Sequence, residues 1–294
     1  MKKIISILLG VILTCTLLAF VGCKTPTPTP EEPTATYKFG AGVYNLAEEK
    51  RGAIEVASNA AAVILEDDKI IAVELDTAAY TNKDGETLTD LRTKGEKKDD
   101  YGMATAAKGN WYVQVEFFKG LVIGKTIDEV KALMASDGYG TDVVKAGCTI
   151  LIDGFVGAIE NAVKNAVEAD VKGANIKVAT FVEAKAGASD VYFAMAALKD
   201  GKIIINESDC VQTKFNTAVG EVLSKRQKGD NYGMASAPKG DWYKQADFFD
   251  GLCAGKTIAE VEALMATDGY GTDVVKAGCT IGITGMVGAI AKLA

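Results

Sequence analysis

The sequence predicts an α+β protein made of two tandem copies of one small unit, and three observations support this fold class. A segment of sixty residues recurs at a constant offset of 131 positions, and 44 of the 60 aligned pairs are identical, so both copies should share one fold. Short apolar runs on either side of polar turns precede each segment, which indicates antiparallel hairpins. Apolar residues at helical spacing follow them.

Composition limits the classes of function. The chain has 294 residues, enough for about two domains, and its formal net charge of −7 argues against a nucleic-acid partner, because phosphate binding needs clustered basic residues. Histidine is absent from the whole sequence, which excludes Ser-His-Asp and Cys-His catalysis and histidine-ligated zinc. Any chemistry must therefore use carboxylates, hydroxyls, thiols, backbone amides or a bound cofactor.

Residues 1–22 are predicted to be a lipoprotein signal peptide. Two lysines precede an apolar run over residues 4–21, the pattern of a secretory leader; a retained membrane anchor is the alternative, because the run is nearly long enough to span a bilayer. Residues 20–23 resemble the lipobox of bacterial lipoproteins, in which the cysteine is lipidated. The resemblance implies a lipid on Cys23 and a place on the extracytoplasmic face of the cell membrane.

Residues 23–36 are predicted to be a tether. Four of the five prolines of the chain lie here, and such a segment favours extended polyproline geometry. The folded part should begin near Tyr37 and divide into residues 37–170 and 171–294. We expect each copy to bury a complete core of its own and to fold autonomously.

Each copy is predicted to begin with a hairpin. Residues 61–73 form two apolar runs around an acidic turn, and residues 192–205 do so around Asp200-Gly201, a strong hairpin signal. A helix is expected over residues 111–121. The next helix should begin at Thr126 and continue through Met134, with Glu129 completing a capping box. Residues 124–126 resemble the end of a phosphate-binding P-loop, but the earlier glycine is absent, so this alternative is disfavoured.

The end of each copy is predicted as a glycine-rich loop, a short strand and a closing helix. The loop covers residues 137–149, the strand residues 150–152, and the closing helices residues 154–169 and 285–293. Residues 137–150 recur unchanged as residues 268–281. One interpretation is a surface loop whose glycines only make turns.

The end of this loop carries a resemblance to a known family. The sequence Ala146-Gly147-Cys148-Thr149, with Asp142 seven residues before the threonine, resembles the Asp-x-x-Ser-Gly-Ala-Thr motif of FMN-binding domains. Such domains occur in the covalent-flavin subunits of sodium-pumping quinone reductases and in Gram-positive extracellular electron-transfer lipoproteins. In that family, a flavin transferase joins FMN to the threonine hydroxyl through a phosphodiester.

The resemblance implies one covalent FMN in each copy. It implies Thr149 and Thr280 as attachment residues, Gly147 and Gly278 as the motif glycines, and Asp142 and Asp273 as the acids. Cys148 and Cys279 stand where the family has alanine, and Ala146 and Ala277 where it has serine. Aromatic residues that recur in both copies, among them Trp111, Tyr112 and Tyr139, are interpreted as flavin contacts or as core residues.

The function implied is that of a flavoprotein on the cell surface that carries electrons from a membrane donor to an extracellular acceptor. It would be an electron carrier more than a self-standing enzyme, and the flavin would supply the chemistry. The alternative is a structural or ligand-binding lipoprotein without a cofactor that keeps the duplicated fold. No metal site is expected because the CxxC pattern is absent from the sequence, and a disulfide between Cys210 and Cys253 stays open.

Overall fold

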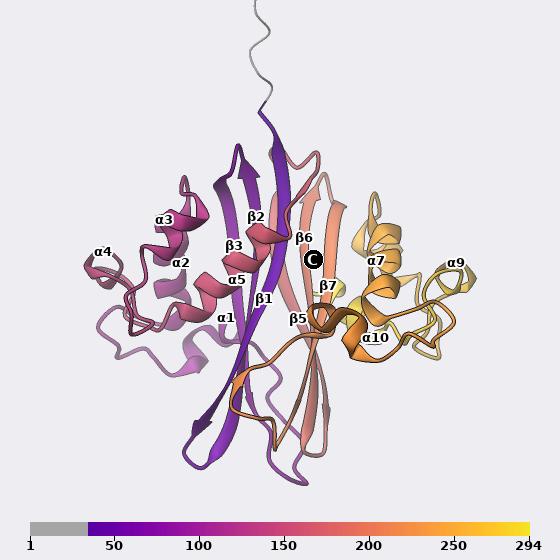
Figure 1. Ribbon diagram of the computed structural model, residues 1–294, viewed down its shortest axis with the longest axis horizontal. Helices are drawn as coiled ribbons and strands as arrows, with labels where there is room; N and C mark the ends of the chain where they lie inside the picture. The colour runs from indigo at the N-terminus through magenta and orange to yellow at the C-terminus, as the bar shows by residue number, and fades with distance from the viewer. Residues whose placement is uncertain (1–34) are drawn as a thin grey trace, which may run out of the picture. The chain divides into compact units, whose positions relative to one another are not determined.

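Two antiparallel sheets, one of five strands and one of three, pack face to face and form the centre of the protein (Figure 1). The computed structural model describes residues 35–294, so the predicted signal peptide, the lipidation of Cys23 and nearly all of the tether lie outside the described residues. Helices cover the outer face of each sheet. The predicted class, α+β with antiparallel strands, is confirmed.

The first sheet is a meander of β1 (Tyr37–Lys50), β2 (Ala53–Glu66) and β3 (Lys69–Thr81). Two short strands, β4 (Val167–Glu168) and β8 (Gly220–Glu221), pair with β1. Strand β2 is buried along most of its length, because both faces of the sheet are covered. This explains why its sequence is a nearly continuous apolar run and does not alternate.

The second sheet repeats this meander with β5 (Asn175–Lys185), β6 (Ala188–Lys199) and β7 (Lys202–Lys214). Asp200 and Gly201 turn from β6 into β7 with φ values of 52° and 74°, as a type I′ turn requires. The two predicted hairpins are therefore confirmed, although their strands are longer than expected. Sequence analysis missed β1 and β5, the first strands of the two meanders.

Helices follow each meander in the same order. Those of the first copy are α1 (Lys94–Lys97), the 3₁₀ helix η1 (Lys98–Tyr101), α2 (Trp111–Val122), α3 (Ile127–Lys131), α4 (Asp142–Lys145) and α5 (Asp153–Lys164). Those of the second copy are α6 (Lys225–Lys228), η2 (Gly229–Tyr232), α7 (Trp242–Cys253), α8 (Ile258–Glu262), α9 (Asp273–Lys276) and α10 (Thr284–Ala291).

Some predicted boundaries need correction. The Thr126–Glu129 capping box is present, with the Glu129 carboxylate accepting the Thr126 amide at 2.8 Å, but α3 ends at Lys131. Residues 150–152 are not a strand, because the amides of Ile152 and Asp153 donate to the Gly138 carbonyl and the chain passes directly into α5. The closing helix α5 ends at Lys164, before the chain turns into β4.

Glycines allow α5 to lie directly on β1. A Cβ atom at Gly40 would be 2.1 Å from the Ala162 carbonyl oxygen, and one at Gly42 would be 2.4 Å from the Ala162 nitrogen. Any other residue at these two positions would push the helix off the sheet. The close approach seals the outer core of the first copy, which α2 completes over β3.

The inner faces of the two sheets form a third core that both copies share. Phe39 and Ile64 of the first sheet and Phe193 and Met195 of the second are each at most 2% exposed within it. The expectation that each copy buries a complete core of its own is therefore wrong. Apolar residues on the second face of each sheet need the other sheet to exclude water.

Polar contacts also cross between the copies. The Asn45 side-chain amide donates to the Val222 carbonyl at 2.9 Å, and that of Gln227 donates to the Val43 carbonyl at 3.0 Å. Strand β8 belongs to the second copy in sequence but pairs with β1 of the first. The two halves are thus interlocked at their edges as well as packed through their sheets.

Candidate functional site

Thr149 lies at the lining of a cavity of about 330 Å³ on the outer side of the first sheet. Its position is fixed by Gln114 of α2, which is fully buried. The Gln114 side-chain oxygen accepts the Thr149 backbone amide at 2.8 Å and the Thr149 hydroxyl at 3.1 Å. The amide nitrogen of Gln114 in turn donates to the Gly109 carbonyl at 2.8 Å. Gln114 therefore orients an exposed hydroxyl whose oxygen lone pairs stay available.

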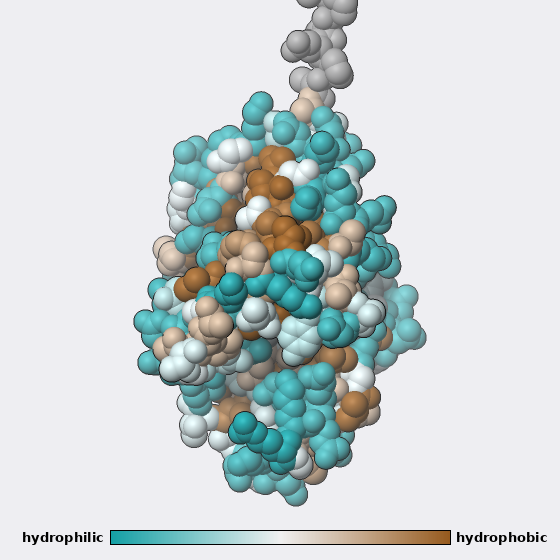
Figure 2. Space-filling model, turned by 90° about the vertical axis from the view of Figure 1, so that its left-hand side faces the viewer, coloured by the Kyte–Doolittle hydropathy of each residue, from teal (hydrophilic) through white to brown (hydrophobic). Residues whose placement is uncertain are grey.

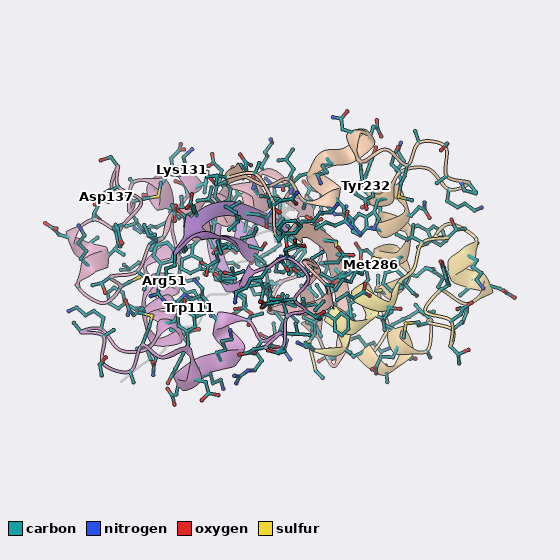
Figure 3. The ribbon with its side chains drawn as sticks, turned by 90° about the horizontal axis from the view of Figure 1, so that it is seen from below. Arg51, Trp111, Lys131, Asp137, Tyr232 and Met286 are labelled. Atoms are coloured by element: carbon teal, nitrogen blue, oxygen red, sulfur yellow. The ribbon has the colours of Figure 1, made fainter. Side chains whose placement is uncertain are left out.

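Aromatic side chains form much of the wall of this cavity. Trp111 of α2 and Phe155 of α5 meet edge to face, with ring centroids 5.9 Å apart, a favourable arrangement for aromatic pairs. Trp111 lies on the side of the first copy, and Tyr232 and Met286 on that of the second (Figure 3). The aromatic residues of the lining are Tyr44, Tyr101, Trp111, Tyr139 and Phe155.

The polar part of the lining contains two lysines, Lys50 and Lys94, two carboxylates, Glu48 and Asp153, and a helix start. Lys94 of α1 lies 5.4 Å from the centre of the Tyr101 ring, and within residues 35–294 it makes no ion pair with a carboxylate. The first residues of α5, Asp153 to Phe155, also line the cavity. An N-terminal helix end favours anions, although the Asp153 carboxylate already accepts the Gly154 amide at 2.8 Å.

The loop before Thr149 is more ordered than predicted. It contains the helical turn α4, and the Thr141 amide donates to the Leu133 carbonyl at 2.8 Å. Asp142 is the first residue of that turn; it is exposed and is not part of the cavity lining. The predicted acid and the predicted attachment residue are therefore not brought together at this cavity.

Gly147 has a packing role. A Cβ atom there would lie 2.4 Å from the Phe117 ring, and at Gly278 one would lie 2.3 Å from the Phe248 ring. The glycine lets an aromatic ring of α2 or α7 rest on the loop just before the threonine. Figure 2 shows apolar residues gathered among polar ones on the side of the molecule that carries α4; Phe117, Val143 and Leu151 are exposed apolar residues of this copy.

Cys148 and Cys279 point away from solvent. Both are fully buried in the outer cores, and burial raises the pKa of both thiols, that of Cys279 to about 11. They are therefore core residues and poor nucleophiles. Cys210 and Cys253 are also buried, and both are free thiols, so the possible disulfide is not formed.

The second copy repeats the contacts of the threonine. The Thr280 amide and hydroxyl donate to the Gln245 side-chain oxygen at 2.8 and 3.1 Å, the distances found for Thr149 and Gln114. Asp273 begins α9 as Asp142 begins α4, and it is also exposed. The identical loop sequences thus give the same local geometry in both copies.

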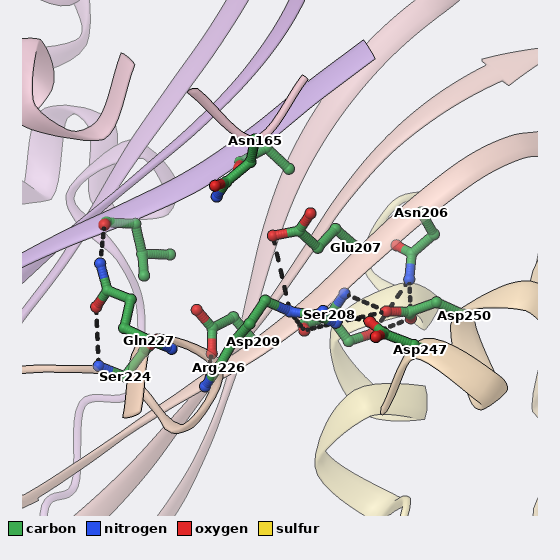
Figure 4. A network of polar contacts seen from close by, with 12 residues as sticks. Asn165, Asn206, Glu207, Ser208, Asp209, Ser224, Arg226, Gln227, Asp247 and Asp250 are labelled. Atoms are coloured by element: carbon green, nitrogen blue, oxygen red, sulfur yellow. Dashed lines mark hydrogen bonds and ion pairs between the residues drawn. The ribbon is translucent and has the colours of Figure 1, made fainter. Parts of the chain in front are cut away.

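A second polar cluster, the Arg226 network, lies between the copies (Figure 4). Arg226 donates to the Asp250 carboxylate at 3.1 Å and also to Asp247, and its Nε lies 3.7 Å from the Glu207 carboxylate. Asp250 also accepts the Ser208 amide at 2.8 Å. Arg226 and Glu207 line two adjoining clefts of about 430 and 520 Å³, which also contain residues of β1 or α5.

Burial is the main cause of the altered protonation in this network. It raises the pKa of Glu207 to about 8 and that of Asp250 to about 6, against the lowering effect of Arg226. Glu207 therefore holds a proton near neutral pH. Within residues 35–294, no group of three or more acidic or thiol side chains is placed to hold a metal ion.

Sequence reasoning missed Asn59, Lys94 and Gln114 at the cavity and the whole Arg226 network. A signal was present for two of these residues, because Gln114 and Lys94 recur as Gln245 and Lys225 at the offset of the repeat. For the Arg226 network, the signal in the sequence is a change of charge between the copies. Lys119 of the first copy is replaced by Asp250 in the second, and Gly95 by Arg226.

Comparisons with models of protein families, with curated proteins and with solved structures find no match to this chain. Over residues 35–294, helices long and apolar enough to cross a membrane are absent. The functional conclusion therefore rests on the geometry of the site and on the sequence motif.

Proposed function

We propose that the protein is a lipid-anchored, extracytoplasmic flavin carrier that holds FMN in the cavity of the first copy, joined through its phosphate to Thr149. The observation that carries this proposal is the position of the Thr149 hydroxyl, exposed and oriented by Gln114 at the lining of an aromatic cavity. A hydroxyl in that place is accessible to a modifying enzyme and adjacent to a space that accepts a planar ring.

The residues of the cavity suit the two ends of the cofactor. Its volume of about 330 Å³ is within the range of small-ligand sites, and Trp111 and the tyrosines offer faces for ring stacking. Lys94 offers a positive charge for the phosphate, and the N-terminal end of α5 adds backbone amides beside the Asp153 carboxylate. Bound FMN would supply the electron transfer, and the protein would supply attachment, orientation and shielding from water.

The attachment step needs a flavin transferase as partner. The bond between the Thr149 oxygen and phosphorus forms as the bond from phosphorus to the leaving group of an activated FMN donor breaks, and the hydroxyl proton is released. The Gln114 contact holds the threonine in one rotamer for this attack. The motif and its contacts recur at Thr280, so the resemblance extends the proposal to that residue.

Fluorescence in a denaturing gel tests the attachment. Protein co-produced with its transferase should fluoresce after denaturation, because a phosphodiester does not depend on the fold. Thr149→Ala should lose the flavin of the first copy and Thr149→Ser should keep part of it, whereas Thr149→Val should behave as alanine does. The matched control is Thr280→Ala, which has the same contacts and must leave the Thr149 signal intact. Unchanged fluorescence in Thr149→Ala would overturn the assignment.

The location belongs to the same proposal. A lipid on Cys23 would hold the domain at the membrane, within reach of a membrane electron donor, at the end of a proline-rich tether. Cys23→Ser should move the protein from the membrane fraction to the soluble fraction, and blocking lipoprotein signal cleavage should leave a heavier precursor. A Cys23→Ser protein that still fractionates with membranes after its leader is removed would contradict lipid anchoring.

A second candidate is a ligand-binding lipoprotein without a covalent cofactor. The observation in its favour is the separation of Asp142 from the cavity, since the acid of the motif then contributes nothing to the site around Thr149. This candidate predicts that purified protein binds small aromatic molecules reversibly and carries no flavin after denaturation.

A further inference from the structure

One pair of equivalent strand positions distinguishes the two copies at the cavity. Asn59 of β2 lies opposite Thr77 of β3, and Tyr192 of β6 lies opposite Cys210 of β7. These positions have the same place in the two meanders, seven residues before the end of the middle strand. A small amide in the first copy thus corresponds to a phenol ring in the second.

Both side chains point to the start of the closing helix. A Cβ atom at Gly154, in the first turn of α5, would lie 2.2 Å from the Asn59 amide nitrogen. A Cβ atom at Gly285, in the first turn of α10, would lie 2.3 Å from the Tyr192 ring. The two side chains therefore occupy the same space between sheet and helix.

In the second copy, this space is filled. Tyr192 is 8% exposed, and Lys225 is 6% exposed. The Lys225 ammonium lies 5.4 Å from the centre of the Tyr192 ring and 5.5 Å from those of Tyr232 and Trp242. Each of the three rings attracts the ammonium group through its face, and one of them, Tyr192, comes from the sheet of the same copy.

In the first copy, the corresponding partners are present and the ring is not. Lys94, Tyr101 and Trp111 correspond to Lys225, Tyr232 and Trp242 at the offset of the repeat, and all three line the open cavity together with Asn59. Lys94 keeps its contact with Tyr101 at 5.4 Å. What the first copy lacks is the aromatic group that Tyr192 supplies in the second.

We infer that the two copies have diverged into one open and one closed ring-binding site. The first accepts a planar aromatic ligand between Lys94, Trp111 and Gly154, and the second is closed by its own Tyr192. The inference rests on the proposed function only for the identity of the ring as a flavin. On this inference, each chain encloses only one aromatic ligand ring, although the contacts of Thr149 recur at Thr280.

The two tryptophans of the chain allow each copy to be tested separately, because Trp111 and Trp242 are equivalent and are the only ones in the sequence. Trp242→Phe leaves Trp111 to report on the first copy, and Trp111→Phe leaves Trp242 to report on the second. Trp111 and Trp242 are both almost fully buried, at 4% and 3% exposed, so a quencher that stays in bulk solvent reaches neither. Nitrobenzene, a planar aromatic quencher of the kind that the open cavity should accept, should bind beside Trp111 and quench it strongly, and should quench Trp242 weakly. Equal quenching of the two reporters would overturn the inference.

Reciprocal substitutions make the test specific. Asn59→Tyr should reduce the quenching of Trp111 to the level of Trp242, and Tyr192→Asn should raise that of Trp242 to the level of Trp111. The matched control is Asn175→Tyr, which makes the same change as Asn59→Tyr at an exposed position and should alter neither reporter. Cooperative unfolding identifies the variants that fold. One folded variant is enough for the test: if Asn59→Tyr leaves the quenching of Trp111 unchanged, or Tyr192→Asn leaves that of Trp242 unchanged, the inference is contradicted.

Titration with riboflavin separates this inference from the proposed function. Calorimetry should give one site in each wild-type chain, loss of that site in Asn59→Tyr, and a second site in Tyr192→Asn. If riboflavin binds to none of these proteins while nitrobenzene still quenches Trp111 more strongly than Trp242, the open and closed sites stand and the flavin assignment fails. If riboflavin binds wild type and Asn59→Tyr equally, the open cavity is not its site and the inference fails.

Discussion

Glu207 of the Arg226 network should make the protein less stable as the pH rises. Its carboxyl group has an ordinary pKa of 4.5, which burial raises to about 8 in the folded state, with the nearby Asp209, Asp250 and Asp247 adding to the effect. The folded protein therefore binds this proton more tightly than the unfolded chain does. The resulting stability is fully present below the unfolded pKa and is lost as the pH rises through the folded pKa.

The size of the effect follows from the two pKa values. One unit of difference corresponds to about 1.4 kcal/mol, so the shift from 4.5 to about 8 gives roughly 5 kcal/mol over the whole range. About half of this, on the order of 3 kcal/mol, should be lost between pH 6 and pH 9. Glu207→Gln keeps the shape of the side chain and removes the titration, so its free energy of unfolding should vary less over this interval.

Urea unfolding at a series of pH values measures this difference. The curves of wild type and Glu207→Gln should diverge with increasing pH, and the variant should be the more stable protein at pH 9. The control is Glu74→Gln, at the equivalent position of the first copy, where the carboxylate pairs with Lys119 at 2.8 Å. Parallel curves for wild type and Glu207→Gln would refute the assignment of a proton to Glu207.

Two further predictions concern packing. Gly147→Ala should lower the free energy of unfolding by about 1–3 kcal/mol, because its Cβ would lie 2.4 Å from the Phe117 ring. Adding Phe117→Leu to Gly147→Ala should recover part of this loss. A Gly147→Ala protein with the free energy of unfolding of wild type would contradict this explanation. Residues 37–170 produced alone should self-associate or lack a cooperative transition, because the inner face around Phe39 is no longer covered by the second sheet. Sedimentation and urea unfolding measure these two properties. A monomer that unfolds cooperatively would show that the first copy does not need the shared core.

The parts of the fold that the sequence predicted were those with local signals. The Asp200-Gly201 turn, the Thr126 capping box and the amphipathic pattern of α5 each depend on a few neighbouring residues. Strand β1 was missed because it contains Gly40 and Gly42, and glycine is unfavourable inside a strand. These two glycines allow the close contact with α5. The contact involves α5, which lies more than a hundred residues later in the sequence, so no local pattern predicts it.

The central core was missed for a related reason. A continuous apolar run such as that of β2 indicates burial on both faces, but it does not say which element covers the second face. The repeat suggested independent units, whereas Phe193 and Met195 pack against the other copy.

At the candidate site, the motif led to Thr149, and the structure adds the partners that the motif lacks. Gln114 is distant in sequence and reaches Thr149 only because α2 packs beside the loop. Asn59 is visible only by comparison with Tyr192, since its effect is the space that it leaves open. Neither residue has a local signature, so only the tertiary arrangement identifies them.

The mass of the protein from its native membrane tests the central claim most directly. Intact-protein mass spectrometry, followed by peptide mapping, should find a gain equal to the mass of one FMN less water on the peptide that contains Thr149, and the gain should be absent from Thr149→Ala. An unmodified Thr149 peptide in protein produced with its flavin transferase present would contradict the account.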